Sequence, residues 1–193
     1  MSQEKLNAKE NVKMSVSTLG NASDSLKPKG TYHVTCHDSN GSLLWEEDIN
    51  NVVCTAGKNL ALDTILSGSA YTVTGPYMGL ISSVSWSATA ATDTMASHSG
   101  WTEAGSTNAP TFASRGTVAF SSASAGSKST SSAVSFTMTG AGTLEGCFLV
   151  YGSGAVNTIG STAGTLLSAG AFTSGSQVVS SGNVVTVSYM LSI

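Results

Sequence analysis

Short apolar stretches separated by serine- and glycine-rich turns constrain the fold of this 193-residue chain more than any other feature. Four of them follow one another at 115–122, 132–140, 143–152 and 183–193. Two alternate apolar and polar residues, as strands with one buried face do: Val134, Phe136 and Met138, and Val185, Val187, Tyr189 and Leu191. The continuously apolar CFLVY predicts a central strand covered on both faces. The spacing predicts an all-β domain, a β-sandwich of jelly-roll type.

The first half adds a predicted hairpin. Residues 30–38 alternate, with Tyr32, Val34 and Cys36 on one face. Asn40-Gly41 predicts a type I′ turn, after which 43–54 returns as a second strand containing a bulge. AYTVTG at 70–75 and YMGLISSVSW at 77–86 predict two further strands.

One short helix is predicted within TAGKNLALDTILSG, residues 55–68. Thr55 is the expected N-cap, and Gly68 follows the expected end. The apolar residues form one stripe along such a helix; they are Ala61, Leu62, Ile65 and Leu66. Because a helix of about 13 residues is marginal in water, we expect this stripe to pack on the sheet.

Charge divides the chain into two parts. Residues 1–29 hold five lysines and three acids, a net +2, whereas residues 30–193 hold three basic residues and eight acids, a net −5. We predict a flexible N-terminal arm at 1–29 and one β-sandwich domain at 30–193. A negative body does not attract phosphate backbones, so nucleic acid is not expected as a direct partner. The polar N-terminus and the lack of a ~20-residue apolar run predict assembly in a cytoplasm, without a membrane partner.

Histidines and cysteines offer weak candidates for chemistry. His33 and His37 share a strand face, but four residues at ~3.3 Å each place them ~13 Å apart, too far for one zinc ion. Cys36 and His37 point to opposite faces and cannot pair as nucleophile and base. The three cysteines of the chain are Cys36, Cys54 and Cys147, and they have no CxxC spacing. We therefore predict solvated histidines and buried thiols.

Glu46, Glu47 and Asp48 form the only acidic cluster. Glu46 and Asp48 on one strand face would fit the lower end of the spacing of a hydrolase carboxylate pair, and clustered oxygens would suit calcium. There is neither EF-hand spacing nor an apolar wall to raise one pKa. A solvated edge or contact surface is therefore the leading interpretation.

The segment TDTMASHSGWTE, residues 92–103, concentrates reactive residue types. We expect Thr92 to cap one helical turn, Asp93 to lie near its positive end, and Trp101 to fill a core gap with its N–H on a carbonyl. Met95 and Ala96 are expected on the buried side of this turn. The chain is then expected to reverse at His98, Ser99 and Gly100. An Asp93–His98–serine arrangement would need a nucleophile elbow and an oxyanion hole, for which we find no pattern. A structural clasp, in a protein that is not an enzyme and has no cofactor, is predicted.

Several of these segments together resemble a known protein family. AYTVTGPYMGLISS followed by TDTMASHSGWTE, with Arg115 a dozen positions later, resembles a block in virion structural proteins of tailed bacteriophages. The nearest likeness is to the capsid cement, or decoration, proteins of certain short-tailed phages, over roughly residues 43–151. The resemblance implies a jelly-roll sandwich and a major capsid protein with the HK97-type fold as partner. Related proteins carry an aromatic-bearing stretch between GWTE and the arginine, whereas AGSTNAPTFAS here is plainer.

The expected function is therefore a homo-oligomeric decoration protein that binds the outside of a phage head and stabilises contacts between capsid subunits. Dimers or trimers would match the shell symmetry axes. The alternative is a tail- or fibre-associated protein that binds a host receptor, for which Tyr71, Trp86 and Trp101 are candidate glycan platforms. A third hypothesis is a hydrolase of cell-surface polymer that uses Glu46, Asp48 or Glu103.

Overall fold

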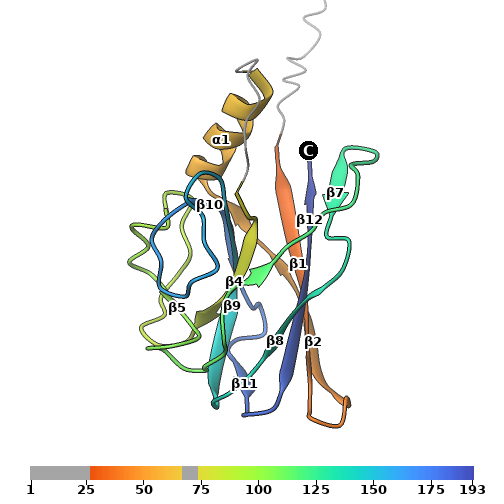
Figure 1. Ribbon diagram of the computed structural model, residues 1–193, viewed down its shortest axis with the longest axis vertical. Coiled ribbons are helices and arrows are strands. Elements are labelled where there is room, and N and C mark those ends of the chain that lie inside the picture. Colours follow the sequence, from red (N-terminus) through yellow and green to blue (C-terminus); the bar gives the residue numbers. More distant parts are fainter. Residues whose placement is uncertain (1–26, 67–73) are drawn as a thin grey trace, which may run out of the picture.

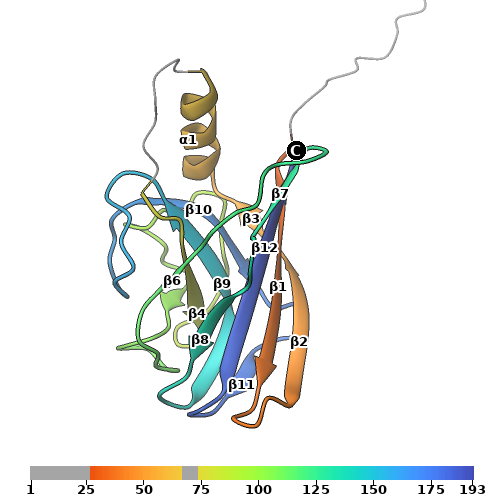
Figure 2. The same ribbon diagram turned by 45° about the vertical axis from the view of Figure 1, so that its right-hand side comes forward.

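The computed structural model describes residues 27–66 and 74–193, and within them the chain forms two packed antiparallel sheets (Figures 1 and 2). Sheet A has the order β2 (Leu43–Asn50), β1 (Lys29–His37), β12 (Val184–Ser192) and β7 (Ser127–Ser129), and β8 (Val134–Thr137) also pairs with β12. Sheet B has the order β3 (Val52–Val53), β10 (Thr165–Ala171), β9 (Gly142–Tyr151), β4 (Tyr77–Ser82) and β5 (Thr102–Glu103). β6 (Gly116–Thr117) pairs with β4, and β11 (Gln177–Val179) pairs with β9. The predicted all-β sandwich with one helix is confirmed.

The main core lies between the two sheets, and the alternating patterns point into it as predicted. Its members include Tyr32, Val34 and Cys36 of β1, Val134, Phe136 and Met138 around β8, and Val185, Val187 and Tyr189 of β12. Leu191 packs against the edge of the same core. Alternation identified these strands because each has one face toward the core and one toward solvent.

The hairpin between β1 and β2 forms, but the predicted turn type is wrong. The Gly41 N–H donates to the Asp38 carbonyl at 3.1 Å, and Gly41 has a φ of +85°. A type I′ turn needs positive φ at both central residues, and Asn40 is not among the described residues with positive φ. The Asp38 carboxylate accepts from the N–H groups of Asn40 and Ser42, both at 2.8 Å. These side-chain bonds stabilise a longer loop that ends on a left-handed glycine.

The second predicted strand, 43–54, is divided between the sheets. β2 pairs with β1, and the register shift at Cys36/His37 is the predicted bulge. After Asn51, whose N–H donates to the Gly30 carbonyl at 3.1 Å, the chain continues as β3 beside β10 in sheet B. One apolar run thus joins the two layers.

β9 is buried on both faces, as CFLVY predicted. Leu144, Cys147 and Leu149 belong to the core between the sheets, whereas Phe148 and Val150 belong to a second core on the outer side of sheet B. Residues of the covering loops complete this second core: Met95, Trp101 and Ala155. The domain therefore has three layers: sheet A, sheet B and the loops that cover the outer side of sheet B.

Four strands were not predicted, β5, β7, β10 and β11, and one predicted strand is much shorter. β10 and β11 lie between 152 and 183, where we expected turns, and β7 lies within the predicted turn SASAGSKSTS. In β10 small residues weaken the usual alternation: a Cβ at Gly170 would lie 2.8 Å from Ile49 Cγ2 and 3.1 Å from the Asn51 Cα. The stretch 115–122 contributes only the two residues of β6.

The helix α1 (Thr55–Leu66) forms where it was predicted, but its contacts differ from those expected. The Cys54 carbonyl accepts the first helical bond, from the Lys58 N–H at 3.0 Å, so the N-cap is Cys54 rather than Thr55. Gly57 is the buried residue, and a Cβ there would lie 2.7 Å from the Leu167 backbone. The predicted apolar stripe does not pack on the sheet: Leu62, Ile65 and Leu66 are 49%, 71% and 77% exposed.

Several predictions fall outside the described residues. These are the arm up to residue 26, Gly68, Tyr71 and most of the strand at 70–75, of which Thr74 and Gly75 are not in a strand. The division into an arm at 1–29 and a domain at 30–193 stays a prediction, although β1 begins at Lys29. None of the described helices is long and apolar enough to cross a membrane.

Candidate functional site

The segment 92–103 closes around the buried side chain of Trp101, which is 2% exposed. The indole N–H donates to the Asp93 carboxylate at 2.9 Å, and the same oxygen accepts from the Ala90 N–H at 2.9 Å. The His98 ring stacks on the indole, with 3.8 Å between centroids and 20° between planes. Phe148 lies 5.2 Å from the indole, centroid to centroid. This geometry is that of a structural clasp.

Three details of the predicted clasp are wrong. Residues 92–97 form a turn closed by Thr94 and Ser97 rather than a helical turn capped by Thr92. Ala96 is exposed, although Met95 is buried as predicted. The indole N–H bonds to a carboxylate instead of a carbonyl, because the buried Asp93 needs donors of its own.

The structure does not assemble the Asp93–His98–serine arrangement. His98 Nδ1 lies 3.0 Å from the Trp101 carbonyl oxygen. Among the described residues no hydrogen bond joins Asp93 to His98, and the Asp93 oxygen that is bonded points to the indole and to Ala90. The two side chains therefore act on Trp101 from different positions.

A buried ion pair, Arg115–Glu103, fastens the loops over sheet B. Arg115, 1% exposed, donates from Nε and Nη2 to the two Glu103 carboxylate oxygens, each at 2.7 Å. It also donates to the carbonyls of Val156 at 3.2 Å and Ser161 at 2.8 Å. The Gly160 N–H completes the set at 2.7 Å from Glu103 Oε2. A two-pronged pair of this kind is geometrically specific, so it fixes loop 156–161 against β5.

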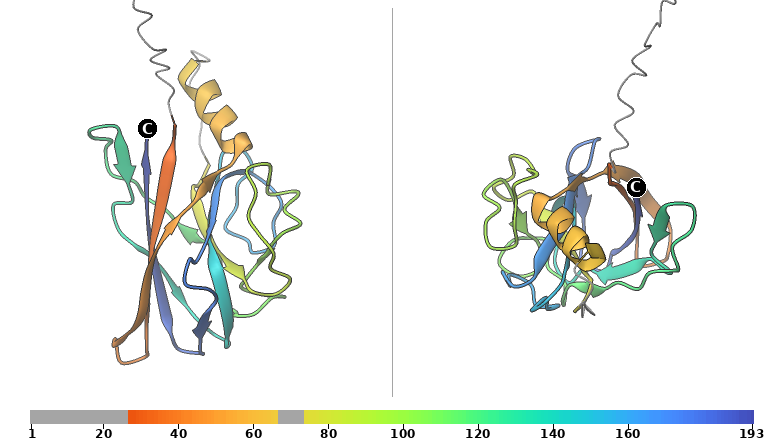
Figure 3. Two further views of the ribbon diagram at one scale, coloured as in Figure 1. Left: turned by 180° about the vertical axis from the view of Figure 1, so that it is seen from behind. Right: turned by 90° about the horizontal axis from the view of Figure 1, so that it is seen from above.

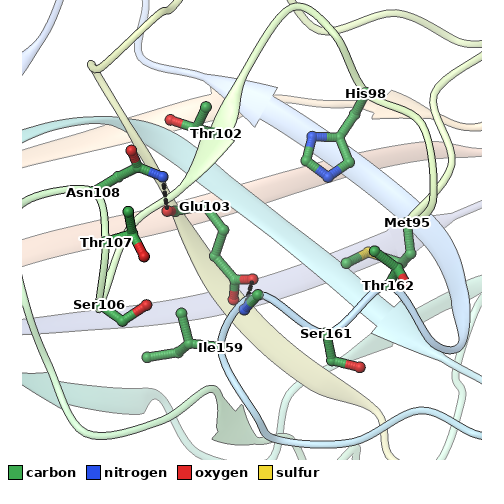
Figure 4. Close-up of a pocket in the computed structure, with 11 residues that line it drawn as sticks. Met95, His98, Thr102, Glu103, Ser106, Thr107, Asn108, Ile159, Ser161 and Thr162 are labelled. Carbon is green, nitrogen blue, oxygen red and sulfur yellow. Dashed lines mark hydrogen bonds between the residues drawn. The ribbon is translucent and has the colours of Figure 1, made fainter.

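The clasp and the ion pair meet beside a shallow pocket of about 210 Å³ (Figure 4). His98, Glu103, Asn108 and Ser161 line it, and the Asn108 amide donates to the Glu103 backbone carbonyl at 3.1 Å. Both carboxylate oxygens of Glu103 are engaged by Arg115 or Gly160, so this carboxylate is committed to holding the loops. The Arg115 guanidinium also lies 5.4 Å from the Phe148 ring centroid, which links the ion pair to the clasp through one aromatic ring.

The acidic cluster of β2 is spread over two faces of sheet A. Glu47 points toward the neighbouring loop, where its carboxylate accepts from the side chains and backbone amides of Thr173 and Ser174. Glu46 and Asp48 lie on the outer face, and Asp48 contacts His33 at 2.8 Å. Glu103 belongs to sheet B, so the three carboxylates of the hydrolase hypothesis are not brought together.

Stability should depend on the charge of Glu47. Burial alone would raise the pKa of Glu47, but the hydrogen bonds from Ser174 and Thr173 lower it below its ordinary value of 4.5. A lowered pKa in the folded state stabilises the fold above the ordinary pKa, and this stability is lost as the pH falls through the folded value.

At pH 7 we expect Glu47→Gln to lower the free energy of unfolding by about 1 kcal/mol or less, since Glu47 is only partly buried and water screens its charge. The difference from wild type should shrink below pH 4.5. Urea unfolding of both proteins between pH 3 and about 7 measures it. A difference that is the same at every pH would contradict the assignment.

The remaining candidates occupy the positions that the sequence predicted. Cys36, Cys54 and Cys147 are free and buried, and burial raises the pKa of Cys36 and Cys54 to about 11 and that of Cys147 further. His33 and His37 share the outer face of β1, and no cluster of three potential metal ligands occurs within 27–66 and 74–193. Trp86 is half-buried against the second core.

The outer face of sheet A carries partly or fully exposed residues from four strands. It is polar and rich in hydroxyl groups: Thr31, His33, Thr35 and His37 from β1, Glu46 and Asp48 from β2, Ser135 and Thr137 from β8, and Thr186 and Ser188 from β12. The hydroxyls of Thr35 and Thr186 are 2.6 Å apart across the strands. A depression of about 330 Å³ lies on this face beside His33 and Ser188. We call it the hydroxyl face.

Comparison of the chain with protein-family models, with curated proteins and with solved structures gives no match in any of the three.

Proposed function

We propose that this protein is a decoration, or cement, protein of a tailed-bacteriophage capsid, and that the hydroxyl face is its contact with the shell. The observation that carries the proposal is the difference between the two sides of the sandwich. Sheet B is covered by the protein's own loops, which Arg115 and Glu103 hold in place. Sheet A leaves a polar surface, with the carboxylates of Glu46 and Asp48 confined to β2, available to another protein.

Such a surface suits the mechanical role of cement. A decoration protein bridges capsid subunits and adds buried area to contacts that internal pressure would pull apart. Hydroxyl groups make short hydrogen bonds without the desolvation cost of charges. The contacts repeat over the shell, and a molecule held at several points dissociates slowly. The sequence resemblance to phage virion proteins supports the same assignment, with an HK97-type major capsid protein as the partner and the virion surface as the location.

The direct test is reconstitution of phage heads that lack this chain. Purified protein should co-sediment with such heads and raise the temperature at which they release DNA. Failure to bind, or density for the chain in the tail alone when intact virions are imaged, would overturn the proposal. The second result would favour the tail- or fibre-associated alternative.

The contact face can be tested within the same assay. Ser135→Arg with Thr137→Arg places two bulky charges on the exposed side of β8. Unpaired charges buried in an interface are costly, so we expect head binding to weaken by at least about tenfold, or 1.4 kcal/mol. Ser106→Arg, on an exposed loop over sheet B, is the matched control and should bind normally. Normal binding by the double variant, with an unchanged melting curve, would place the contact elsewhere.

A further inference from the structure

The helix α1 carries an apolar surface that the described part of the protein does not bury. Leu62, Ile65 and Leu66 follow one another at helical spacing and are 49%, 71% and 77% exposed. The first turn is held against sheet B: Gly57 lies against Leu167, and its carbonyl accepts from the Tyr151 hydroxyl at 3.3 Å. A 12-residue helix is marginal in water without packing on its apolar side. The far end of α1 therefore needs a partner.

The apolar surface continues beyond the helix. Ala61 lines an almost entirely apolar pocket of about 220 Å³, together with Pro76, Phe120, Leu149, Leu167 and Leu191. Ile193, directly after β12, is 65% exposed. Figures 1 and 3 show α1 and the C-terminus at the same end of the molecule. We call this end of the molecule, formed by α1, the apolar pocket and Ile193, the helix pole. Its apolar character is that of an interaction site.

The order of residues along α1 identifies the partner. Asn59, Leu62 and Leu66 are spaced by three and four residues, which is the a–d–a spacing of a coiled-coil seam. On the same register Lys58 and Asp63 take the flanking g and e positions. In parallel coiled coils a g residue meets the e residue five positions later on the neighbouring helix. Lys58 and Asp63 are opposite in charge and five residues apart.

An antiparallel pair fits these residues less well. A twofold axis that brings Lys58 next to Asp63 across antiparallel helices would place Leu62 opposite Asn59 and Leu66 opposite Thr55. The apolar residues would then face polar ones. Only the parallel arrangement matches leucine with leucine and also pairs the two charges.

We propose that α1 is a self-association element, through which copies of this chain join by parallel packing of their helices. Leu62 and Leu66 form the seam, and Lys58 of one copy pairs with Asp63 of the next. The apolar helix poles of the copies then lie side by side and shelter Ile65. The partner is a second copy of this chain. The inference concerns the protein in free solution and does not depend on attachment to a capsid.

Light scattering coupled to size-exclusion chromatography tests this self-association on the full chain. Wild type should have a mass that is two or three times 19.4 kDa, and Leu62→Glu with Leu66→Glu should have the monomer mass with an unchanged circular dichroism spectrum. Val178→Glu, at a 69% exposed position of β11, is the matched control and should keep the wild-type mass. A monomeric wild type, or a double variant that stays associated, would overturn the inference.

Two further variants test the orientation of the helices. Lys58→Asp alone and Asp63→Lys alone should each weaken association, and the two together should restore it. Asn59→Cys should form a disulfide between copies, since the three native thiols are buried and matching seam positions approach within disulfide reach in a parallel pair. In an antiparallel pair centred on the leucines, a rise of 1.5 Å per residue separates the two positions by more than ~13 Å. Association without this crosslink would overturn the parallel arrangement.

Discussion

Arg115→Met is expected to lower the free energy of unfolding by about 3–5 kcal/mol, because it leaves the Glu103 carboxylate buried without its cation. Glu103 is 8% exposed and would keep only the Gly160 N–H as a carboxylate donor among the described contacts. For a domain of this size the loss corresponds to a melting temperature lower by roughly 6–20 °C. Thermal and urea unfolding followed by circular dichroism measure both quantities.

Two comparisons show whether the effect comes from the buried pair. Lys128→Met removes an exposed charge and should change stability by about 0.5 kcal/mol or less. Arg115→Met with Glu103→Leu removes both charges and should recover much of the lost stability. The interpretation fails if Arg115→Met costs no more than Lys128→Met, or if the second substitution adds to the loss.

The second large effect is expected at the clasp. Trp101→Ala should cost about 3–5 kcal/mol, since it removes a large buried side chain and leaves a cavity between His98 and Phe148. Trp101→Phe keeps an aromatic ring but removes the donor to Asp93, and should cost about 1–3 kcal/mol. Urea unfolding of the two variants separates the packing contribution from that of the hydrogen bond.

Trp86→Ala provides the matched control, because Trp86 is only half-buried against the same second core. Its cost should be clearly smaller than that of Trp101→Ala. Equal costs at the two positions would mean that loop 92–103 does not depend on the tryptophan it encloses.

The sequence identified the strands whose two faces differ. β1, β8 and β12 each alternate because one face meets the core and the other meets solvent. β10 lacks this contrast, since it is built partly of small residues and its glycine, Gly170, lies too close to Ile49 and Asn51 for a side chain. Small residues carry little periodic signal, so this strand was missed although it is central to sheet B.

The helix illustrates a different limit. Periodicity states which residues of α1 share a face, and that part was correct. It does not state what covers the face, and the expectation of the sheet as partner was wrong. The local cap was also missed, because Cys54 provides a backbone carbonyl rather than a recognisable capping side chain.

The buried ion pair between Arg115 and Glu103 could not be predicted from the sequence, for a related reason. Glu103 of β5 and Arg115, directly before β6, are twelve residues apart, and loop 156–161 completes their bonds from far along the chain. One signal was available: Arg115 is the only arginine of the sequence. A guanidinium group can donate several hydrogen bonds in one plane, which the ammonium group of a lysine cannot do. A single arginine among serines and glycines therefore suits such a role.

The arrangement of the chain ends has a practical consequence for attaching cargo to this protein. Lys29 pairs with Ser192, and the C-terminus lies at the same end of the molecule as α1 (Figures 1 and 2). A fluorescent label or antigen fused after Ile193 would crowd the very surface on which copies are expected to meet. The β1–β2 hairpin lies at the opposite end, where Ser39 and Asn40 are exposed and the space around Gly41 is open. Insertion there should display a passenger domain and leave both the hydroxyl face and the helix pole unobstructed.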